Sequence, residues 1–296
     1  MSGDWPTVAP GERIAVIAPA GPFDVDAFGR GVERLRRHYD VVVDDAVTAR
    51  EGFLAGSDAR RLGELRAALA DSDVRALVAV RGGYGSTRLL PQLPVDEVAR
   101  AGKLLVGFSD ITALHALWAR AGIGSLHGPM VAALGRGDDT QLERFRDAVA
   151  GRPPQTQTQL RTLHGGAAAG PLHGGNLAVL CALLGTPYMP PLDGAVLFLE
   201  DVGERPYRID RMLTSLIHSG ALSKVAAVAL GHFTDCNASA DADHPSAEDV
   251  LRERLAELHV PVVAGLPAGH VDDNLPLPLG RIVELDADAG QLHFAD

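Results

Sequence analysis

The sequence predicts an α/β protein built on a parallel sheet with helices on both faces, with room for two domains. Short apolar runs of the length of a buried strand recur along the chain and alternate with segments of helical apolar spacing. Of the 296 residues, 46% are hydrophobic and 22% are charged, the composition of an ordinary globular protein. A chain of this length exceeds the usual size of one domain, so two are expected.

The first half of the chain shows this alternation most clearly. Strands are expected at 13–19, 39–43, 76–80 and 104–106, and helices at 24–37, 58–69, 111–117 and 141–150. Strands that alternate with helices form a parallel sheet, and such sheets bind ligands beyond the carboxyl ends of their strands. The turns that follow 76–80 and 104–106 are therefore the first candidates for a functional site.

A change of composition separates the two halves. Residues 151–159 combine prolines with polar residues and show no periodicity, which is typical of a linker. We therefore expect domains at 1–150 and 171–296, joined by a linker at 151–170. A glycine-rich run follows at 165–175. Beyond it, helices are expected at 176–184, around 213–217 and at 248–258, and strands at 194–200, 225–230 and 260–266.

The net charge and the number of cysteines indicate which classes of partner and which cellular compartment to expect. A formal net charge of −11 argues against nucleic acid or an anionic membrane as a partner, since both attract clustered Lys and Arg. No stretch resembles a secretion signal, and no apolar run approaches the roughly 18 residues of a membrane span. Two cysteines fit a reducing compartment. These features predict a cytoplasmic protein.

One acidic loop has some of the residue types of a metal site. His244 lies among Asp241, Asp243 and Asp249, but no second histidine stands at the spacing of a zinc site. A solvated loop is the favoured interpretation, and neither a metal nor a cofactor is predicted.

Ser109 marks a change from strand to turn to helix. The apolar run 104–106 ends at Gly107, and helical spacing begins at Ile111. A serine in such a turn projects over the carboxyl edge of the sheet, where it can act as a nucleophile. Serine is also a preferred N-cap residue, so the residue type alone leaves both interpretations open.

A glycine-rich turn at 81–86 follows the strand expected at 76–80. It lacks the Gly-Lys-Ser/Thr ending of a P-loop, so phosphate binding is poorly supported. A plain turn and an oxyanion hole both fit the pattern. In the second case a backbone N–H near Gly83 and the N–H of Asp110, the residue after Ser109, would bind a developing oxyanion.

Two further residues complete the set that a serine hydrolase requires. His270 follows the strand expected at 260–266 and is the candidate base. Glu200 ends the strand expected at 194–200 and is the candidate acid, with Glu204 in reserve. Each has an ordinary structural alternative, because a histidine can simply occupy a turn and a glutamate can be a solvated or ion-paired charge.

Five motifs occur in order along nearly the whole chain. They are Arg-Gly-Gly-Tyr-Gly-Ser at 81–86, Gly-Phe-Ser-Asp-Ile-Thr at 107–112, Gly-Gly-Asn-Leu at 174–177, Leu-Glu-Asp-Val-Gly-Glu-Arg-Pro-Tyr-Arg-Ile-Asp-Arg at 199–211, and Gly-His at 269–270 followed by Leu-Pro-Leu-Gly at 277–280. This set resembles the motifs of the LD-carboxypeptidases, the cytoplasmic muramoyl-tetrapeptide carboxypeptidases that are grouped with the microcin-immunity peptidases.

The resemblance implies a Rossmann-like parallel-sheet N-terminal domain that carries the serine and a smaller α/β C-terminal domain that carries the glutamate and histidine, with the site in the cleft between them. By resemblance, Ser109 is the nucleophile, Glu200 the acid and His270 the base, and the backbone N–H groups of Gly83 and Asp110 form the oxyanion hole. The implied protein is a homodimeric serine peptidase without metal or cofactor. It removes the terminal D-alanine from cytoplasmic murein tetrapeptides through an acyl-enzyme.

The residues that hold the substrate are open, and the candidates are Arg81, Tyr84, Arg205 and Arg208. Among relatives, microcin-immunity peptidases hydrolyse peptidyl or aminoacyl adenylates, but the loop 234–246 has no aromatic residue to stack on adenine, which favours the wall peptide. An α/β-hydrolase esterase is a further alternative, although Ile111 replaces the second glycine of Gly-x-Ser-x-Gly. A non-catalytic two-domain protein that binds a small molecule is the alternative of another class.

Overall fold

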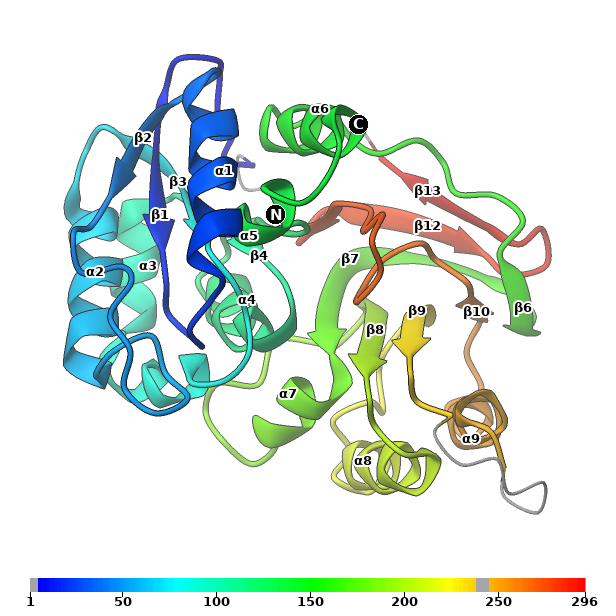
Figure 1. The fold of residues 1–296 in the computed structure, drawn as a ribbon. Helices are drawn as coiled ribbons and strands as arrows, with labels where there is room; N and C mark the ends of the chain where they lie inside the picture. Colours follow the sequence, from blue (N-terminus) through cyan, green and yellow to red (C-terminus); the bar gives the residue numbers. More distant parts are fainter. Residues whose placement is uncertain (1–4, 238–244, 296) are drawn as a thin grey trace. The chain divides into compact units, whose positions relative to one another are not determined.

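The computed structural model describes residues 5–237 and 245–295. The chain folds into two compact units, one formed by 1–153 with 275–280 and the other by 154–274 with 281–296. Within the described ranges, the first unit contains a six-stranded sheet and the second a seven-stranded sheet, each packed with helices (Figure 1). The predicted α/β class, with a parallel sheet in the first half and a second α/β unit, is therefore confirmed.

The sheet of the first unit is parallel except at one edge. Its strand order is β11-β5-β4-β3-β1-β2, and β11 runs antiparallel to β5 while the other neighbours are parallel. The strands are β1 (Arg13–Ile17), β2 (Asp40–Val43), β3 (Val74–Ala79), β4 (Leu104–Gly107), β5 (Ser125–His127) and β11 (Leu277–Leu279). Because β1, β3 and β4 are neighbours, the turns that follow their carboxyl ends lie next to one another.

Helices cover both faces of this sheet. They are α1 (Val25–Arg36), α2 (Asp58–Ala70), α3 (Val95–Ala101), α4 (Thr112–Arg120), α5 (Val131–Leu134) and α6 (Asp139–Val149). The apolar residues of α1, α5 and α6 share one core with alternate residues of the strands, and α2, α3 and α4 lie on the other face (Figure 1). Side chains cap the starts of α1, α2 and α6: Asp24 accepts the N–H groups of Asp26 and Ala27, Ser57 accepts that of Arg60, and Asp138 accepts that of Gln141.

The second unit has a parallel centre with antiparallel edges. Its strand order is β13-β12-β7-β8-β9-β10-β6, in which β7 to β10 are parallel and β6, β12 and β13 are antiparallel to their neighbours. The strands are β6 (Arg161–His164), β7 (Ala167–Asn176), β8 (Val196–Val202), β9 (Ala227–Thr234), β10 (Val262–Ala264), β12 (Ile282–Asp286) and β13 (Gln291–Phe294).

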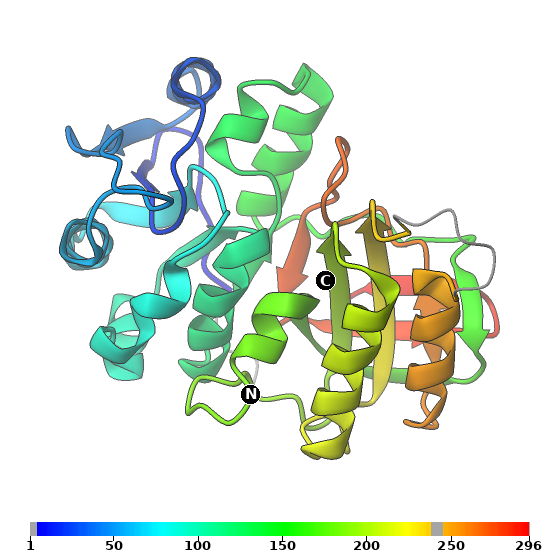
Figure 2. The ribbon, with the colours of Figure 1, turned by 60° about the horizontal axis from the view of Figure 1, so that its bottom comes forward.

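Three helices of the second unit cover one face of its parallel strands. They are α7 (Leu177–Ala182), α8 (Pro206–His218) and α9 (Ala247–Ala256), and their buried residues form one core with β8, β9 and β10 (Figure 1 and Figure 2). The charged stretch before α8 is followed by the predicted amphipathic helix, whose Ile209, Leu213 and Leu216 are buried. No helix of the described residues combines the length and apolarity needed to cross a membrane.

The structure departs from the sequence predictions around the linker and the glycine-rich run. Strands β6 and β7 begin inside the segment 151–170 that we expected to be a linker, and 275–280 returns to the first unit, where it supplies β11. The glycine-rich run 165–175 lies mostly in β7. Its glycines allow close approach to β8: a Cβ on Gly174 would lie 2.0 Å from the carbonyl oxygen of Phe198. Glycine here marks tight strand packing rather than a loop.

Candidate active site

Ser109 occupies a strained turn between β4 and α4. Its φ is +63°, in the left-handed region that non-glycine residues rarely adopt, and residues Ser109–Ile111 form a single 3-10 turn before the helix. The N-cap positions of this turn and of α4 are Phe108 and Ile111, so Ser109 is not the residue that caps either element. Such a strained serine between a strand and a helix is the geometry of a nucleophile elbow.

The glycine-rich turn lies directly against Ser109. A Cβ on Gly82 would be 2.9 Å from Ser109 Cβ, 3.1 Å from its Oγ and 3.2 Å from the backbone nitrogen of Asp110. Only glycine allows this approach. On its other side, the carbonyl of Gly82 accepts a hydrogen bond from the N–H of Gly21 at 3.0 Å. The backbone at 82–83 is therefore held between the turn after β1 and the serine turn after β4.

Asp110 connects the serine turn to the end of the glycine-rich turn. Its carboxylate accepts the N–H of Ser86 at 2.8 Å, and its backbone carbonyl accepts the hydroxyl of Ser86 at 2.5 Å. Both residues are buried, and burial raises the pKa of the Asp110 carboxyl. The fully buried Arg61 supports the glycine-rich turn, because its guanidinium donates to the carbonyls of Gly85, at 2.8 Å, and of Pro19.

In the second unit, His270 and Glu200 form a hydrogen-bonded pair. Glu200 is completely buried near the end of β8, and its Oε2 lies 2.7 Å from Nδ1 of His270. A carboxylate accepts hydrogen bonds, so Nδ1 carries the proton and Nε2 is the basic nitrogen. Gly269 makes the contact possible with a φ of +115°, since a Cβ there would lie 2.8 Å from Glu200 Oε2. The hydroxyl of Thr234 donates to the carbonyl of His270 at 2.8 Å.

Two acidic residues close to Glu200 in the sequence have other partners. Glu204 lies 2.7 Å from the guanidinium of Arg208, so the geometry matches Glu200, not Glu204, to the histidine. Asp201 accepts hydrogen bonds from the side-chain amide of Asn176 at 3.0 Å and from a backbone N–H of α7. Burial raises the pKa of Asp201 to about 6. Asp201 therefore fixes the start of α7, while its neighbour Glu200 holds the imidazole.

The four candidate substrate-binding residues are divided between the two units. Arg81 is exposed on the glycine-rich turn, and its Nη1 donates to the carbonyl of Pro22 at 2.5 Å. Tyr84 is also exposed and packs edge to face against Phe53, with ring centroids 5.3 Å apart. In the second unit, Arg205 is exposed at the N-cap position of α8, and Arg208 is paired with Glu204 as described.

The structure thus brings the predicted residues together in two groups. Ser109, Gly83 and Asp110 share the carboxyl edge of the first sheet, and Glu200 and His270 share the second unit. Sequence reasoning missed the roles of Ser86, which bonds Asp110 in the serine turn, and of Arg61, which bonds the carbonyls of Gly85 and Pro19. The glycine spacing at 82, 83 and 85 was the available signal that this turn packs tightly.

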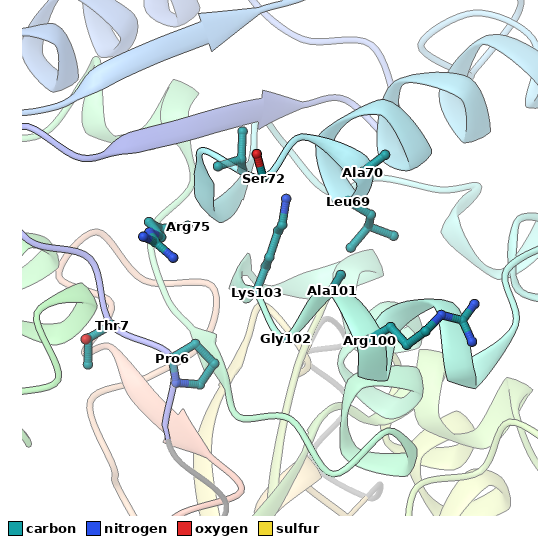
Figure 3. A pocket seen from close by; sticks show the side chains of 11 residues that line it. Pro6, Thr7, Leu69, Ala70, Ser72, Arg75, Arg100, Ala101, Gly102 and Lys103 are labelled. Atoms are coloured by element: carbon teal, nitrogen blue, oxygen red, sulfur yellow. The ribbon is translucent and has the colours of Figure 1, made fainter.

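A cavity of about 380 Å³ lies at the opposite, amino end of the first sheet. Its lining includes Arg75, Arg100 and Lys103, and Figure 3 shows the two arginine side chains on opposite sides of the lysine. The Nζ of Lys103 donates to the carbonyls of Ala68, at 2.8 Å, and Asp71, and so satisfies the C-terminal end of α2. The cations do not converge on one point, and this cavity is separate from the serine turn.

No group of three or more histidine, cysteine, aspartate or glutamate side chains in the described part of the chain is arranged to hold a metal ion. His244, together with Asp241 and Asp243, lies outside the described residues, so the predicted solvated loop remains a prediction.

The chain thus combines a parallel α/β unit that has a strained serine turn with an α/β unit that has a carboxylate-bound histidine. These are the residue types of a hydrolase, and comparison with known proteins shows which family the chain belongs to. Residues 14–128 match the family model for the LD-carboxypeptidase N-terminal domain, and residues 169–285 match that for the LD-carboxypeptidase C-terminal domain. The chain belongs to the LD-carboxypeptidase family, as the motifs predicted.

Individual relatives agree with this assignment. The chain is 34% identical over 291 residues to the murein tetrapeptide carboxypeptidase of Pseudomonas aeruginosa, a match that covers 93% of this chain and 94% of the relative. It superposes on the crystal structure of muramoyltetrapeptide carboxypeptidase from Oxalobacter formigenes with a TM-score of 0.85 and 36% identity, covering 96% of this chain and 99% of that one. It is also 28% identical to the microcin C7 self-immunity protein MccF of Escherichia coli, over 95% of this chain and 92% of the relative.

Proposed function

We propose that this protein is a serine carboxypeptidase that removes the terminal D-alanine from cytoplasmic murein tetrapeptides. The bond to be cut joins an L-configured centre to a D-configured terminal residue. Support comes from relatives named as murein or muramoyl tetrapeptide carboxypeptidases at 34% and 36% identity over nearly the whole chain. The observation that carries the catalytic assignment is the strained Ser109, packed against Gly82 at the carboxyl edge of a parallel sheet.

In the proposed reaction, Ser109 attacks the carbonyl carbon of the scissile bond. His270 takes the serine proton at Nε2, and Glu200 keeps the imidazole in that tautomer and stabilises the imidazolium that forms. The N–H groups of Gly83 and Asp110 bind the oxyanion. Collapse of the tetrahedral intermediate passes the proton to the leaving nitrogen, so that D-alanine departs and an acyl-enzyme remains. Water then attacks the acyl-enzyme with His270 again as the base, and Ser109 is regenerated.

This mechanism requires the two groups of residues to meet in a cleft between the units, as the family resemblance implies. A matched pair of variants tests it. Ser109→Ala removes the nucleophile and is expected to lower turnover by about 10⁴- to 10⁶-fold. Ser57→Ala removes an exposed hydroxyl that caps α2 through the N–H of Arg60, and is expected to leave turnover near that of the wild type.

The substrate is tested with peptides that differ at one centre. We expect release of alanine from a tetrapeptide that ends in D-alanine and much slower release from the same peptide ending in L-alanine. Comparable cleavage of the two peptides would remove the substrate assignment. A fluorophosphonate probe is expected to label the wild type at Ser109 and not the Ser109→Ala variant. Absence of labelling and of turnover would favour the non-catalytic binding protein.

Hydrolysis of peptidyl or aminoacyl adenylates is the second candidate function, and the relationship to MccF favours it. The same assay distinguishes the two, because an adenylate releases AMP whereas the wall peptide releases D-alanine. A simple ester in the panel covers the esterase alternative. Faster consumption of the adenylate or the ester would displace the wall peptide as substrate. We also expect a homodimer by family resemblance, which light scattering on the purified protein tests.

A further inference from the structure

A carboxypeptidase must recognise the free carboxylate of the residue it removes. We propose that Arg81 binds this carboxylate. This inference rests on the proposed function and explains how the enzyme would select peptides with a free C-terminus. Arg81 stands directly before Gly82, the glycine that packs against Ser109, on the same unit as the nucleophile. Its position relative to the serine is therefore set by one sheet and its turns.

Bond geometry determines where such a cation must lie. In the last residue of a peptide, three covalent bonds separate the scissile carbonyl carbon from the carboxylate carbon, a reach of about 3.6 Å. The attacking oxygen approaches the carbonyl carbon at about 3 Å, and a paired guanidinium carbon lies about 4 Å from the carboxylate carbon. A carboxylate-binding arginine should therefore have its guanidinium within about 10 Å of the nucleophilic oxygen.

The strand order places Arg81 at this range. Its guanidinium is held at the carbonyl of Pro22, in the turn after β1, whereas Ser109 lies in the turn after β4. Strand β3 separates β1 from β4, and neighbouring strands are about 4.8 Å apart, so the two turns are about 10 Å apart along the sheet edge. A Cβ on Gly83 would lie 3.9 Å from Cζ of Arg81, so the guanidinium borders the proposed oxyanion hole.

The charge of Arg81 is available to a ligand. Among the described residues, the acceptor that Arg81 contacts is the neutral carbonyl of Pro22, and no carboxylate compensates its charge. Other arginines of the first unit differ in this respect, since Arg88 lies 2.8 Å from Asp58 and Arg60 lies 2.5 Å from Glu64. Arg81 is exposed, and one hydrogen bond leaves the rest of its planar guanidinium able to grip a carboxylate through two N–H groups.

The bond to Pro22 also prepares the side chain for binding. The turn that contains Pro22 is joined to the glycine-rich turn by the hydrogen bond from the N–H of Gly21 to the carbonyl of Gly82. The backbone of Arg81 and the carbonyl that its guanidinium contacts are therefore held in fixed positions relative to each other. A side chain that is already held loses less conformational entropy on binding. The structure therefore presents a charged group in place, one residue's length from the bond to be cut.

The test combines a change in the protein with a change in the ligand. Binding is measured with two proteins, the Ser109→Ala variant and the Ser109→Ala/Arg81→Met double variant. Both lack the nucleophile, so the peptide stays intact during the measurement. The ligands are the L,D-tetrapeptide with a free C-terminal carboxylate and the same peptide as its C-terminal amide. By calorimetry, we expect Ser109→Ala to bind the acid about 10- to 100-fold more tightly than the amide, and the Arg81→Met double variant to bind both alike.

Two controls separate the charge of Arg81 from its effect on folding. Arg81→Lys keeps a positive charge without the planar fork and is expected to retain part of the preference for the acid. Arg100→Met removes an exposed arginine from α3, which lines the cavity at the other end of the sheet, and is expected to retain all of it. Circular dichroism of each variant checks the fold.

The outcomes for this inference and for the proposed function are distinct. A preference for the acid that survives Arg81→Met overturns the inference, even if the wild type hydrolyses the peptide. Equal binding of acid and amide by Ser109→Ala overturns it as well. Loss of the preference for the acid in the Arg81→Met double variant supports the inference. It does so even if the wild type fails to hydrolyse the peptide in turnover assays.

Discussion

Asp110 and Ser86 are joined by two hydrogen bonds, one to the carboxylate of Asp110 and one to its backbone carbonyl. The residue that follows the serine is thereby fixed to the end of the glycine-rich turn. The two proposed oxyanion donors, the N–H groups of Gly83 and Asp110, belong to these two segments. Their separation is consequently set by buried hydrogen bonds rather than by the flexible backbone of a glycine turn.

Replacing Ser86 with alanine removes the hydroxyl bond and keeps the backbone one. We expect the free energy of unfolding to fall by about 1 kcal/mol. If the pair positions the oxyanion donors, kcat falls about tenfold while KM changes little, because the lost interaction matters most in the transition state. Steady-state kinetics with the preferred substrate measure this, with Ser57→Ala as the control for a lost hydroxyl of similar stability. Equal kcat values for Ser86→Ala and Ser57→Ala would contradict the positioning role.

Adding one methyl group at Gly82 should lower activity strongly. The new Cβ would lie 2.9 Å from Ser109 Cβ, closer than two carbon atoms can pack, so the serine or the turn must move. We expect kcat/KM to fall by at least about 100-fold, since small displacements of a catalytic group are costly. Gly29→Ala in α1 is the matched control, because nothing lies within 4 Å of its Cβ and alanine favours helix. A Gly82→Ala enzyme as active as Gly29→Ala would refute the contact.

Neutralising the two glutamates should affect activity very differently. Glu200→Gln preserves the size of the side chain but removes the charge that stabilises the imidazolium of His270, and we expect kcat to fall about 10³-fold or more. Glu204→Gln breaks the ion pair with Arg208, which is more than half exposed, and should change kcat less than about threefold. Kinetics of both purified variants across pH 6 to 9 test this. The reverse ranking would transfer the acid role to Glu204.

The buried His115 should make the first unit sensitive to acid. Its Nε2 lies 2.8 Å from the carbonyl of Gly107 and its Nδ1 lies 2.8 Å from the hydroxyl of Ser125, and burial lowers its pKa to about 4. The ordinary pKa of histidine is near 6.5, so the unfolded chain takes up a proton between pH 6.5 and 4 that the folded chain refuses. The free energy of unfolding attributable to His115 is complete above pH 6.5 and falls by at most about 3 kcal/mol as pH approaches 4.

Urea titrations of the wild type and His115→Gln at pH 7, 6 and 5 measure this dependence. The difference between the two proteins is the informative quantity, because the carboxyl of Glu64, whose pKa burial raises to about 7, acts in the opposite sense. We expect the variant to be less stable than the wild type at pH 7 and the gap to narrow as the pH falls. A constant gap across this range would contradict the assignment.

Much of the architecture was predictable because local burial leaves a local pattern. The buried strands β3 and β4 appear as apolar runs, and α1 and α2 begin at residues whose side chains cap them. Strand β7 was not predicted, since its run of alanines and glycines lacks the large apolar residues that mark a strand. At Gly174, whose φ is +128°, a Cβ would lie 2.0 Å from the carbonyl oxygen of Phe198 in β8, so no side chain fits there.

The sequence by itself determined the α/β class, the turn that carries Ser109, and the residue types of the candidate site, because each depends on neighbours within a few positions. Only the tertiary structure decided that Glu200 and not Glu204 meets His270, and that Ser86 holds Asp110. It also decided that Arg81 meets the carbonyl of Pro22 and, within residues 5–237 and 245–295, no carboxylate. Ser86 and Asp110 are 24 residues apart in the chain, and Glu200 and His270 are 70 residues apart. The contact of Arg81 depends on β1 and β3 being neighbours in the sheet. Spacing along a chain specifies which face a side chain occupies, whereas the partner it meets there is set by the path of the whole backbone.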